Sequence, residues 1–144
     1  MTFETNLHAI ILVTSDTSYF NIPDLENLIA HITDYNKANN ISELLVWANG
    51  NMLHLLEGNK ESLAAKYEKI TQFPTIEGTI KLFDKPINQR YFEDYYFAYK
   101  PINSEMFKPY DSFAQPPQKE FFEECLATDD SIMKIIREFI KNNS

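Results

Sequence analysis

The sequence predicts an α+β fold, a ferredoxin-like sheet built in the order β-α-β-β-α-β with one more strand added. Short apolar runs of strand length alternate with amphipathic stretches at helical spacing. An Asn-Gly pair joins two of these runs as a hairpin. The hairpin runs are apolar at both alternating sets of positions, which indicates a sheet covered on both faces. We therefore expect two helices on one face and C-terminal helices on the other.

The first strand and the first helix occupy the N-terminal quarter of the chain. A run rich in Ile and Val over residues 8–14 predicts a buried strand. Pro23 suits the first position of a helix. The apolar residues that follow it recur at helical spacing: Leu25, Leu28, Ile29, Ile32 and Tyr35. Residues 36–40, "NKANN", favour a helix end. The pattern thus predicts an amphipathic helix of about four turns.

A β-hairpin and a second helix follow. The apolar runs 44–48 and 52–56 flank Asn49-Gly50, a pair that readily adopts the positive φ angles of a tight hairpin turn. Asn59 then suits the N-cap of a helix, because its side-chain oxygen can accept from the first free N–H groups. The predicted apolar stripe of this helix comprises Leu63, Tyr67 and Ile70.

The remaining chain is expected to complete and cover the sheet. Two more strands are predicted at residues 79–83 and 94–99, and a Pro-containing connector follows them. Two helical stripes come next: Phe121, Phe122, Cys125 and Leu126, then Ile132, Ile135, Ile136, Phe139 and Ile140. We therefore predict a ferredoxin-fold domain over residues 1–102, with residues 103–144 as the connector and helical cap of the same compact unit.

Composition excludes several classes of function. The 144 residues carry a formal charge of −8, which disfavours nucleic acid and anionic membrane surfaces as partners. The apolar runs are far shorter than the roughly 20 residues of a spanning helix. The first residues lack the pattern of a signal peptide, and the lone Cys125 cannot form an internal disulfide. We expect a cytoplasmic protein without a metal site.

One histidine interrupts the apolar hairpin. In "MLHLLEG", residues 52–58, His54 occupies the middle of a run that otherwise predicts a buried strand. One interpretation is a core histidine that is hydrogen-bonded within the fold. The other is a histidine that faces a ligand, since imidazole can donate through one nitrogen and accept through the other.

Several segments, taken in order, carry a resemblance to a known family. A helix ending near Asn36 precedes "ISELLVW", the hairpin leads into "LLEG", and "PINQRYFEDYYF" has Arg90 two residues before Phe92 and an aromatic residue three after it. With these motifs the chain resembles the BLUF domains, bacterial sensors of blue light that bind FAD. The resemblance runs from about Leu7 to Tyr99. The tail is similar to the paired helices that cap the sheet in short, single-domain members.

The resemblance implies a flavin, FAD or FMN, held between the two helices that pack on the sheet. The residues expected beside it are Leu12, Leu28, Ile32, Asn36, His54 and Arg90. Asn36 matches the family's asparagine, whose amide can both donate to and accept from the polar edge of the isoalloxazine ring. Its other interpretation is a helix C-cap. Arg90 is suited to a planar, bidentate contact, and its other interpretation is a surface charge.

Two residues depart from the family's light chemistry. The resemblance implies a tyrosine that gives an electron and a proton to the excited flavin, and a glutamine that relays the proton. Leu12 occupies the tyrosine position and His54 the glutamine position. Leucine can give neither an electron nor a proton to the excited flavin. Imidazole cannot undergo the rotation or tautomerism of an amide. Glu43 also replaces a usual glycine. The ordinary photocycle is therefore not expected.

Three hypotheses follow. The first is a BLUF-like, FAD-binding sensory or signalling protein without the photocycle, which forms a homo-oligomer or binds a protein partner. The alternative is a cofactor-free protein–protein interaction module on the same fold. The third, an enzyme or haem-type protein using His54, lacks support because the three histidines show no metal-ligand spacing and no nucleophile–base pair is evident. We expect no enzymatic activity.

Overall fold

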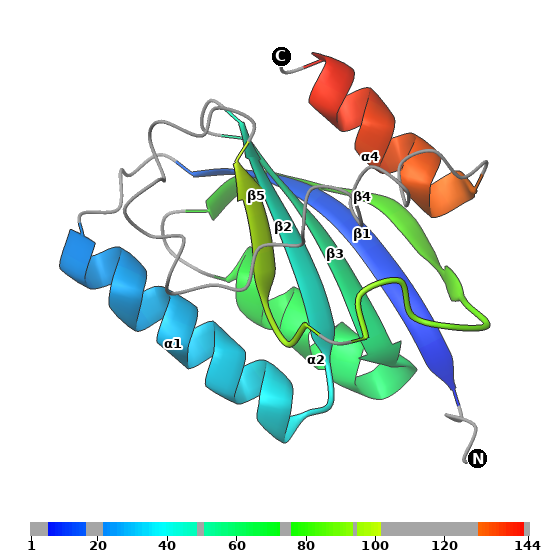
Figure 1. The fold of residues 1–144 in the computed structure, drawn as a ribbon, viewed down its shortest axis with the longest axis horizontal. Coiled ribbons are helices and arrows are strands. Elements are labelled where there is room, and N and C mark those ends of the chain that lie inside the picture. Colours follow the sequence, from blue (N-terminus) through cyan, green and yellow to red (C-terminus); the bar gives the residue numbers. More distant parts are fainter. Residues whose placement is uncertain are drawn as a thin grey trace.

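The computed structural model describes residues 6–16, 22–48, 51–72, 76–93, 95–101 and 130–142. The predicted α+β fold is confirmed, with α1 and α2 on one face of a single sheet and α4 on the other (Figure 1). The elements are β1 (Leu7–Asp16), α1 (Ile22–Ala38), β2 (Ser42–Ala48), β3 (Asn51–Asn59), α2 (Lys60–Thr71), β4 (Ile76–Pro86), β5 (Ala98–Pro101) and α4 (Ser131–Asn142). None of the described helices is long and apolar enough to cross a membrane.

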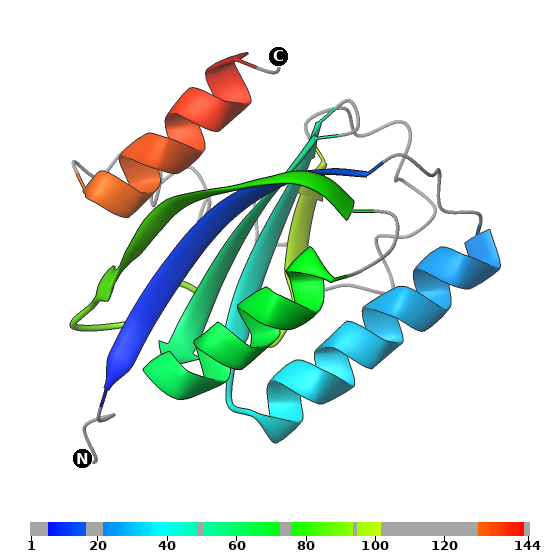
Figure 2. The same cartoon turned by 180° about the vertical axis from the view of Figure 1, so that it is seen from behind.

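The five strands lie in the order β4-β1-β3-β2-β5. The first four form the ferredoxin-like core, in which β1 pairs antiparallel with both β3 and β4, and β2 pairs antiparallel with β3. The added strand, β5, pairs in parallel with β2 at one edge. Figure 2 shows the opposite side of this arrangement, with α1 and α2 lying along the same face.

The hairpin and the second helix form as predicted. Ala48 pairs with Asn51, so two residues connect β2 to β3; the conformation of the turn itself lies outside the described residues. Asn59 caps α2, since its side-chain oxygen accepts a hydrogen bond from the Glu61 N–H at 2.9 Å.

The end of α1 differs from one of the two interpretations of Asn36. The left-handed residue that ends the helix is Asn40, with φ of 53°. The N–H of Ile41 donates to the Asn36 carbonyl at 2.8 Å and that of Asn40 to the Lys37 carbonyl, the pair of bonds typical of a Schellman motif. Asn36 therefore belongs to the last turn and is not the cap, which leaves its side chain for the interior.

Packing of α4 on the sheet confirms the second predicted C-terminal stripe. Ile132, Ile136 and Phe139 are buried, as is Met133, which the stripe did not include. They join one apolar cluster with residues of the sheet such as Leu53. The first predicted stripe, residues 121–126, lies outside the described residues. The boundary between residues 102 and 103 stays a prediction.

The fifth strand is shorter and later than expected. Instead of residues 94–99 it comprises Ala98–Pro101. The preceding segment is irregular: the Tyr95 N–H donates to the Phe92 carbonyl at 3.0 Å, and the Tyr96 carbonyl accepts from the Asn36 side chain at 2.6 Å. These two backbone groups are therefore bound within the segment and to α1, and not to a neighbouring strand.

Candidate functional site

The two departures from the family's chemistry lie directly opposite each other. In the antiparallel pairing of β1 with β3, Leu12 is the partner of His54. Leu12 is fully buried in an apolar cluster with Ile10, Leu56 and Leu63, on the face that carries α2. The sequence-predicted pair is thus brought together, on the side of the sheet where the resemblance places the flavin.

His54 has one close partner and one distant one. Its Nε2 lies 3.0 Å from the Thr14 hydroxyl, which is also buried. Its Nδ1 lies 3.5 Å from the Glu43 carboxylate, which is longer than an ordinary N–H···O hydrogen bond. Nδ1 is accordingly a buried nitrogen without a hydrogen-bond partner. The histidine is therefore only partly satisfied by its own fold.

Asn36, Glu43 and Lys66 form a buried polar network between the helices and the sheet. The Asn36 amide nitrogen donates to Glu43 Oε1 at 3.0 Å and to the Tyr96 carbonyl at 2.6 Å. The Lys66 ammonium donates to both Asn36 Oδ1 and Glu43 Oε1. The exposed fractions are 0% for Asn36, 2% for Glu43 and 5% for Lys66. A complete charge pair is thus enclosed where hydrophobic patterning predicts a core.

The electrostatics of this network favour the ionised carboxylate. Burial raises the pKa of Glu43, but the Lys66 charge and the interaction with His54 outweigh it and lower the pKa from 4.5 to about 2. An isolated buried carboxylate would instead be neutralised. Glu43 is therefore held as an anion because Lys66 is beside it.

Arg90 lies apart from this network and binds backbone. Its guanidinium donates to the Asn40 carbonyl at 2.8 Å, and to the Glu57 carbonyl and the Ser42 hydroxyl at 3.2 Å each. Burial raises the pKa of the neighbouring Glu57, against the hydrogen bonds from Tyr91 and other partners. The hydrogen bonds of the guanidinium connect the segment after β4 to the ends of α1, β2 and β3.

The remaining predicted residues belong to α1. Ile32 is half-buried, and the side chain of Leu28 is outside those that the structure describes. Sequence reasoning missed Lys66, although a signal was present: it lies three residues after Leu63 and four before Ile70, within the predicted apolar stripe. A charged residue on an apolar stripe indicates a buried partner.

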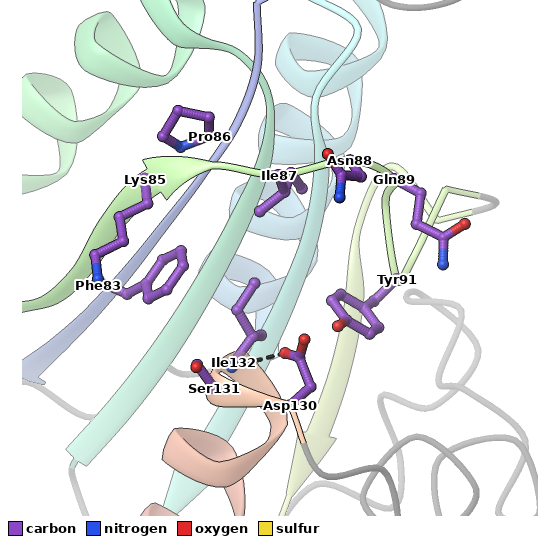
Figure 3. A pocket seen from close by; sticks show the side chains of 10 residues that line it. All are labelled: Phe83, Lys85, Pro86, Ile87, Asn88, Gln89, Tyr91, Asp130, Ser131 and Ile132. Carbon is purple, nitrogen blue, oxygen red and sulfur yellow. Dashed lines mark hydrogen bonds between the residues drawn. The ribbon is translucent and has the colours of Figure 1, made fainter.

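A cavity of about 440 Å³ lies on the other side of the molecule, at the start of α4 (Figure 3). It is lined by Phe83, Lys85, Pro86, Ile87, Asn88, Gln89, Tyr91, Asp130, Ser131 and Ile132. Asp130 is already engaged there, because its carboxylate accepts the Ile132 N–H at 2.8 Å. None of the six predicted site residues lines this cavity.

Comparison with protein families identifies the family of this chain. The profile of BLUF, described as "Sensors of blue-light using FAD", matches residues 7–98, which is more than half of the chain. The chain belongs to the BLUF family. The sequence-based resemblance is thereby confirmed, as is the fold class. No curated protein sequence matches it.

Solved structures share the BLUF fold at low identity. BlrP1 from Klebsiella pneumoniae, in a manganese and cyclic di-GMP complex, gives a TM-score of 0.71 at 16% identity, covering 94% of this chain and 33% of that one. BlsA in its photo-activated state gives 0.65 at 16% identity, covering 95% and 94%. A bacterial light-regulated adenylyl cyclase gives 0.64 at 18% identity, covering 74% and 32%. The chain thus spans about a third of BlrP1 and of the cyclase.

The polar groups of this BLUF site do not fit a flavin in the arrangement described. Both amide hydrogens of Asn36 are donated to protein oxygens, and its own oxygen accepts from Lys66. Lys66 reaches from α2 to Asn36 on α1, across the region between the helices. Leu12 offers no polar atom. The Nδ1 of His54 is the exception. It has no hydrogen-bond partner in the protein, so it could still bind a ligand.

Proposed function

We propose that this chain is a regulatory protein of the BLUF family that does not carry out the family's light reaction. It acts instead through contacts with a second copy of itself or with a protein partner. The observation that carries the proposal is the buried cross-strand pair of Leu12 and His54. No catalytic activity is proposed.

The chemistry of that pair supports the proposal. The light reaction implied by the resemblance begins with an electron and a proton leaving a tyrosine on β1. A leucine supplies neither, and its burial at 0% exposure leaves no room for a solvent-borne substitute at that position. On β3, an imidazole can exchange a proton but cannot reproduce the rotation or tautomerism of an amide. Both steps that generate the family's signal therefore lack their groups.

Illumination of the purified protein tests the proposal. The sample contains excess FAD, so that failure to respond cannot result from a shortage of cofactor in the solution, and BlsA serves as the positive control. We expect no reversible red-shifted absorption after blue light, and the same molecular mass in the dark and in the light by light scattering. A reversible red shift like that of the control would refute the proposal.

A second candidate is a BLUF protein that holds FAD without using it as a photoreceptor. The buried, unpaired Nδ1 of His54 favours it, because a flavin edge could supply the missing hydrogen bond. Such a protein would be yellow as purified, with a flavin spectrum that blue light does not shift. The network of Asn36, Glu43 and Lys66 disfavours it, since these groups already bind one another.

A further inference from the structure

We infer that Lys66 and Glu43 take the place of the flavin, so that the family's cofactor site is closed from within by an ion pair of this chain. The inference deepens the proposed function and rests on it. It concerns a different property, however: the proposed function denies a light response, whereas the inference denies flavin binding itself. The inference can therefore fail while the proposed function stands.

The hydrogen bonds of Asn36 are all made within the chain. An amide facing a flavin edge would need an acceptor for its nitrogen and a donor for its oxygen. Here Glu43 accepts from the nitrogen at 3.0 Å, and Lys66 donates to the oxygen. The ion pair thus offers Asn36 the same two complementary groups that a flavin edge presents. The asparagine is fully buried and needs no external ligand.

The three residues of the network lie on three different elements. Asn36 comes from the last turn of α1, Glu43 from the start of β2, and Lys66 from the middle of α2. Their contacts therefore join both helices to the sheet at one point. A planar ring held between α1 and α2 would have to separate Lys66 from Asn36. Occupation by flavin and the observed network are for this reason mutually exclusive.

A neighbouring lysine shows that helix position alone does not bury Lys66. Lys69 lies one turn later on α2, and both ammonium groups lie over the Tyr35 ring, at 5.7 Å for Lys66 and 5.1 Å for Lys69. Lys69 is nevertheless exposed, whereas Lys66 is 5% exposed. The difference is the carboxylate and the amide that receive Lys66. A buried ammonium is retained only where such partners compensate its lost hydration.

The test measures FAD binding in the dark by quenching of flavin fluorescence. Wild type is compared with the double variant Lys66→Ala/Glu43→Gln and with the matched control Lys69→Ala. The glutamine is included because removal of Lys66 alone would leave Glu43 as a buried charge without its cation. We expect no saturable binding to wild type or to the control, and saturable binding to the double variant.

Two results would overturn the inference. Saturable binding of FAD by wild type shows that the ion pair does not close the site, and if that complex ignores blue light the proposed function still holds. Absence of binding by every variant shows that Lys66 is not what excludes the flavin. A reversible light response would refute both proposals together, because it requires a bound flavin.

A measurement on wild type keeps the inference testable should the double variant not fold. The side-chain amide protons of Asn36 are followed by NMR in the absence of flavin. Slow exchange with solvent supports a site closed by Lys66 and Glu43. Fast exchange overturns it, since those protons would then be open to water and free for a ligand.

Discussion

The two faces of the sheet are packed by different means. Under α4 lies a cluster of apolar side chains, which includes Leu44, Val46, Leu53 and Leu55 of the sheet and Met133 and Ile136 of the helix. Against α1 and α2 a smaller apolar cluster around Leu12 lies beside the network of Asn36, Glu43 and Lys66. The first face depends on removal of apolar surface from water, and the second also depends on exact pairing of charges.

A single strand illustrates the difference. Along β3, Leu53 and Leu55 enter the cluster under α4, whereas Leu56 enters the one under α2 and His54 pairs with Leu12 of that same cluster. Over residues 53–56, alternation of side chains thus sends Leu53 and Leu55 to one face and His54 to the other. Polar groups in a core reduce stability unless each finds its partner. On the face of α1 and α2, Asn36, Glu43 and Lys66 find these partners in one another.

Removal of Lys66 should give the largest loss of stability. Lys66→Met keeps most of the side chain's length but leaves the buried Glu43 carboxylate without its cation. Breaking one side of a buried ion pair costs about 3–5 kcal/mol. Urea unfolding followed by circular dichroism measures this free energy. The matched control Lys69→Met, on the exposed lysine of the same helix, should change it by less than about 0.5 kcal/mol.

The double variant Lys66→Met/Glu43→Leu sharpens the comparison of the two faces. It converts the polar network into an apolar contact like those under α4, and such replacements are often neutral or stabilising. We expect it to recover most of the loss caused by Lys66→Met. Equal instability of the single and the double variant would show that the uncompensated charge of Glu43 does not cause the loss of stability.

On the other face, Met133→Ala should cost about 2–4 kcal/mol, because Met133 is fully buried and its truncation leaves a cavity. Here the loss comes from missing packing contacts and not from an uncompensated charge. The exposed neighbour Lys134→Ala is the control. Denaturant unfolding measures the change in the free energy of unfolding. A change below about 0.5 kcal/mol for Met133→Ala would mean that α4 contributes little to the fold.

Acid should unfold the protein partly through Glu43. Its pKa is lowered from 4.5 to about 2, so its ionised form stabilises the fold above pH 4.5, and the contribution is lost as the pH falls towards 2. The shift corresponds to about 3 kcal/mol. Unfolding free energies measured from about pH 6 to about pH 2 should show this decrease. Lys66→Met/Glu43→Leu, which has neither charge, should lack that part of it.

Sequence patterns were informative where burial repeats with a simple period. The stripe with Ile132, Ile136 and Phe139 predicted which side of α4 is buried, and the hairpin flanking Asn49-Gly50 predicted the pairing of β2 with β3. The pattern failed for the fifth strand, because the Tyr95 N–H binds the Phe92 carbonyl and the Tyr96 carbonyl binds the side chain of the distant Asn36. The spacing of apolar residues along the chain carries no information about such a contact between distant residues.

The candidate site was predicted unevenly for the same reason. The resemblance led to Asn36, Leu12 and His54, and the structure places all three on one face. Arg90 binds carbonyl oxygens of the chain, and its expected place beside a cofactor stays a prediction. Lys66 was missed because its partner Glu43 lies 23 residues away. Burial of a lysine is decided by that partner and not by the helix that carries it.

Replacement of His54 should have the smallest effect. His54→Leu removes the 3.0 Å contact with Thr14 and the longer, 3.5 Å approach of Nδ1 to the Glu43 carboxylate, and it adds apolar surface beside Leu12. A lost hydrogen bond and the gained burial are each worth about 1 kcal/mol, so the net change should stay below about 1 kcal/mol. Urea unfolding measures it. A loss above about 2 kcal/mol would show that His54 stabilises the network together with Lys66, and would weaken the support that its unpaired nitrogen gives to the candidate that holds FAD.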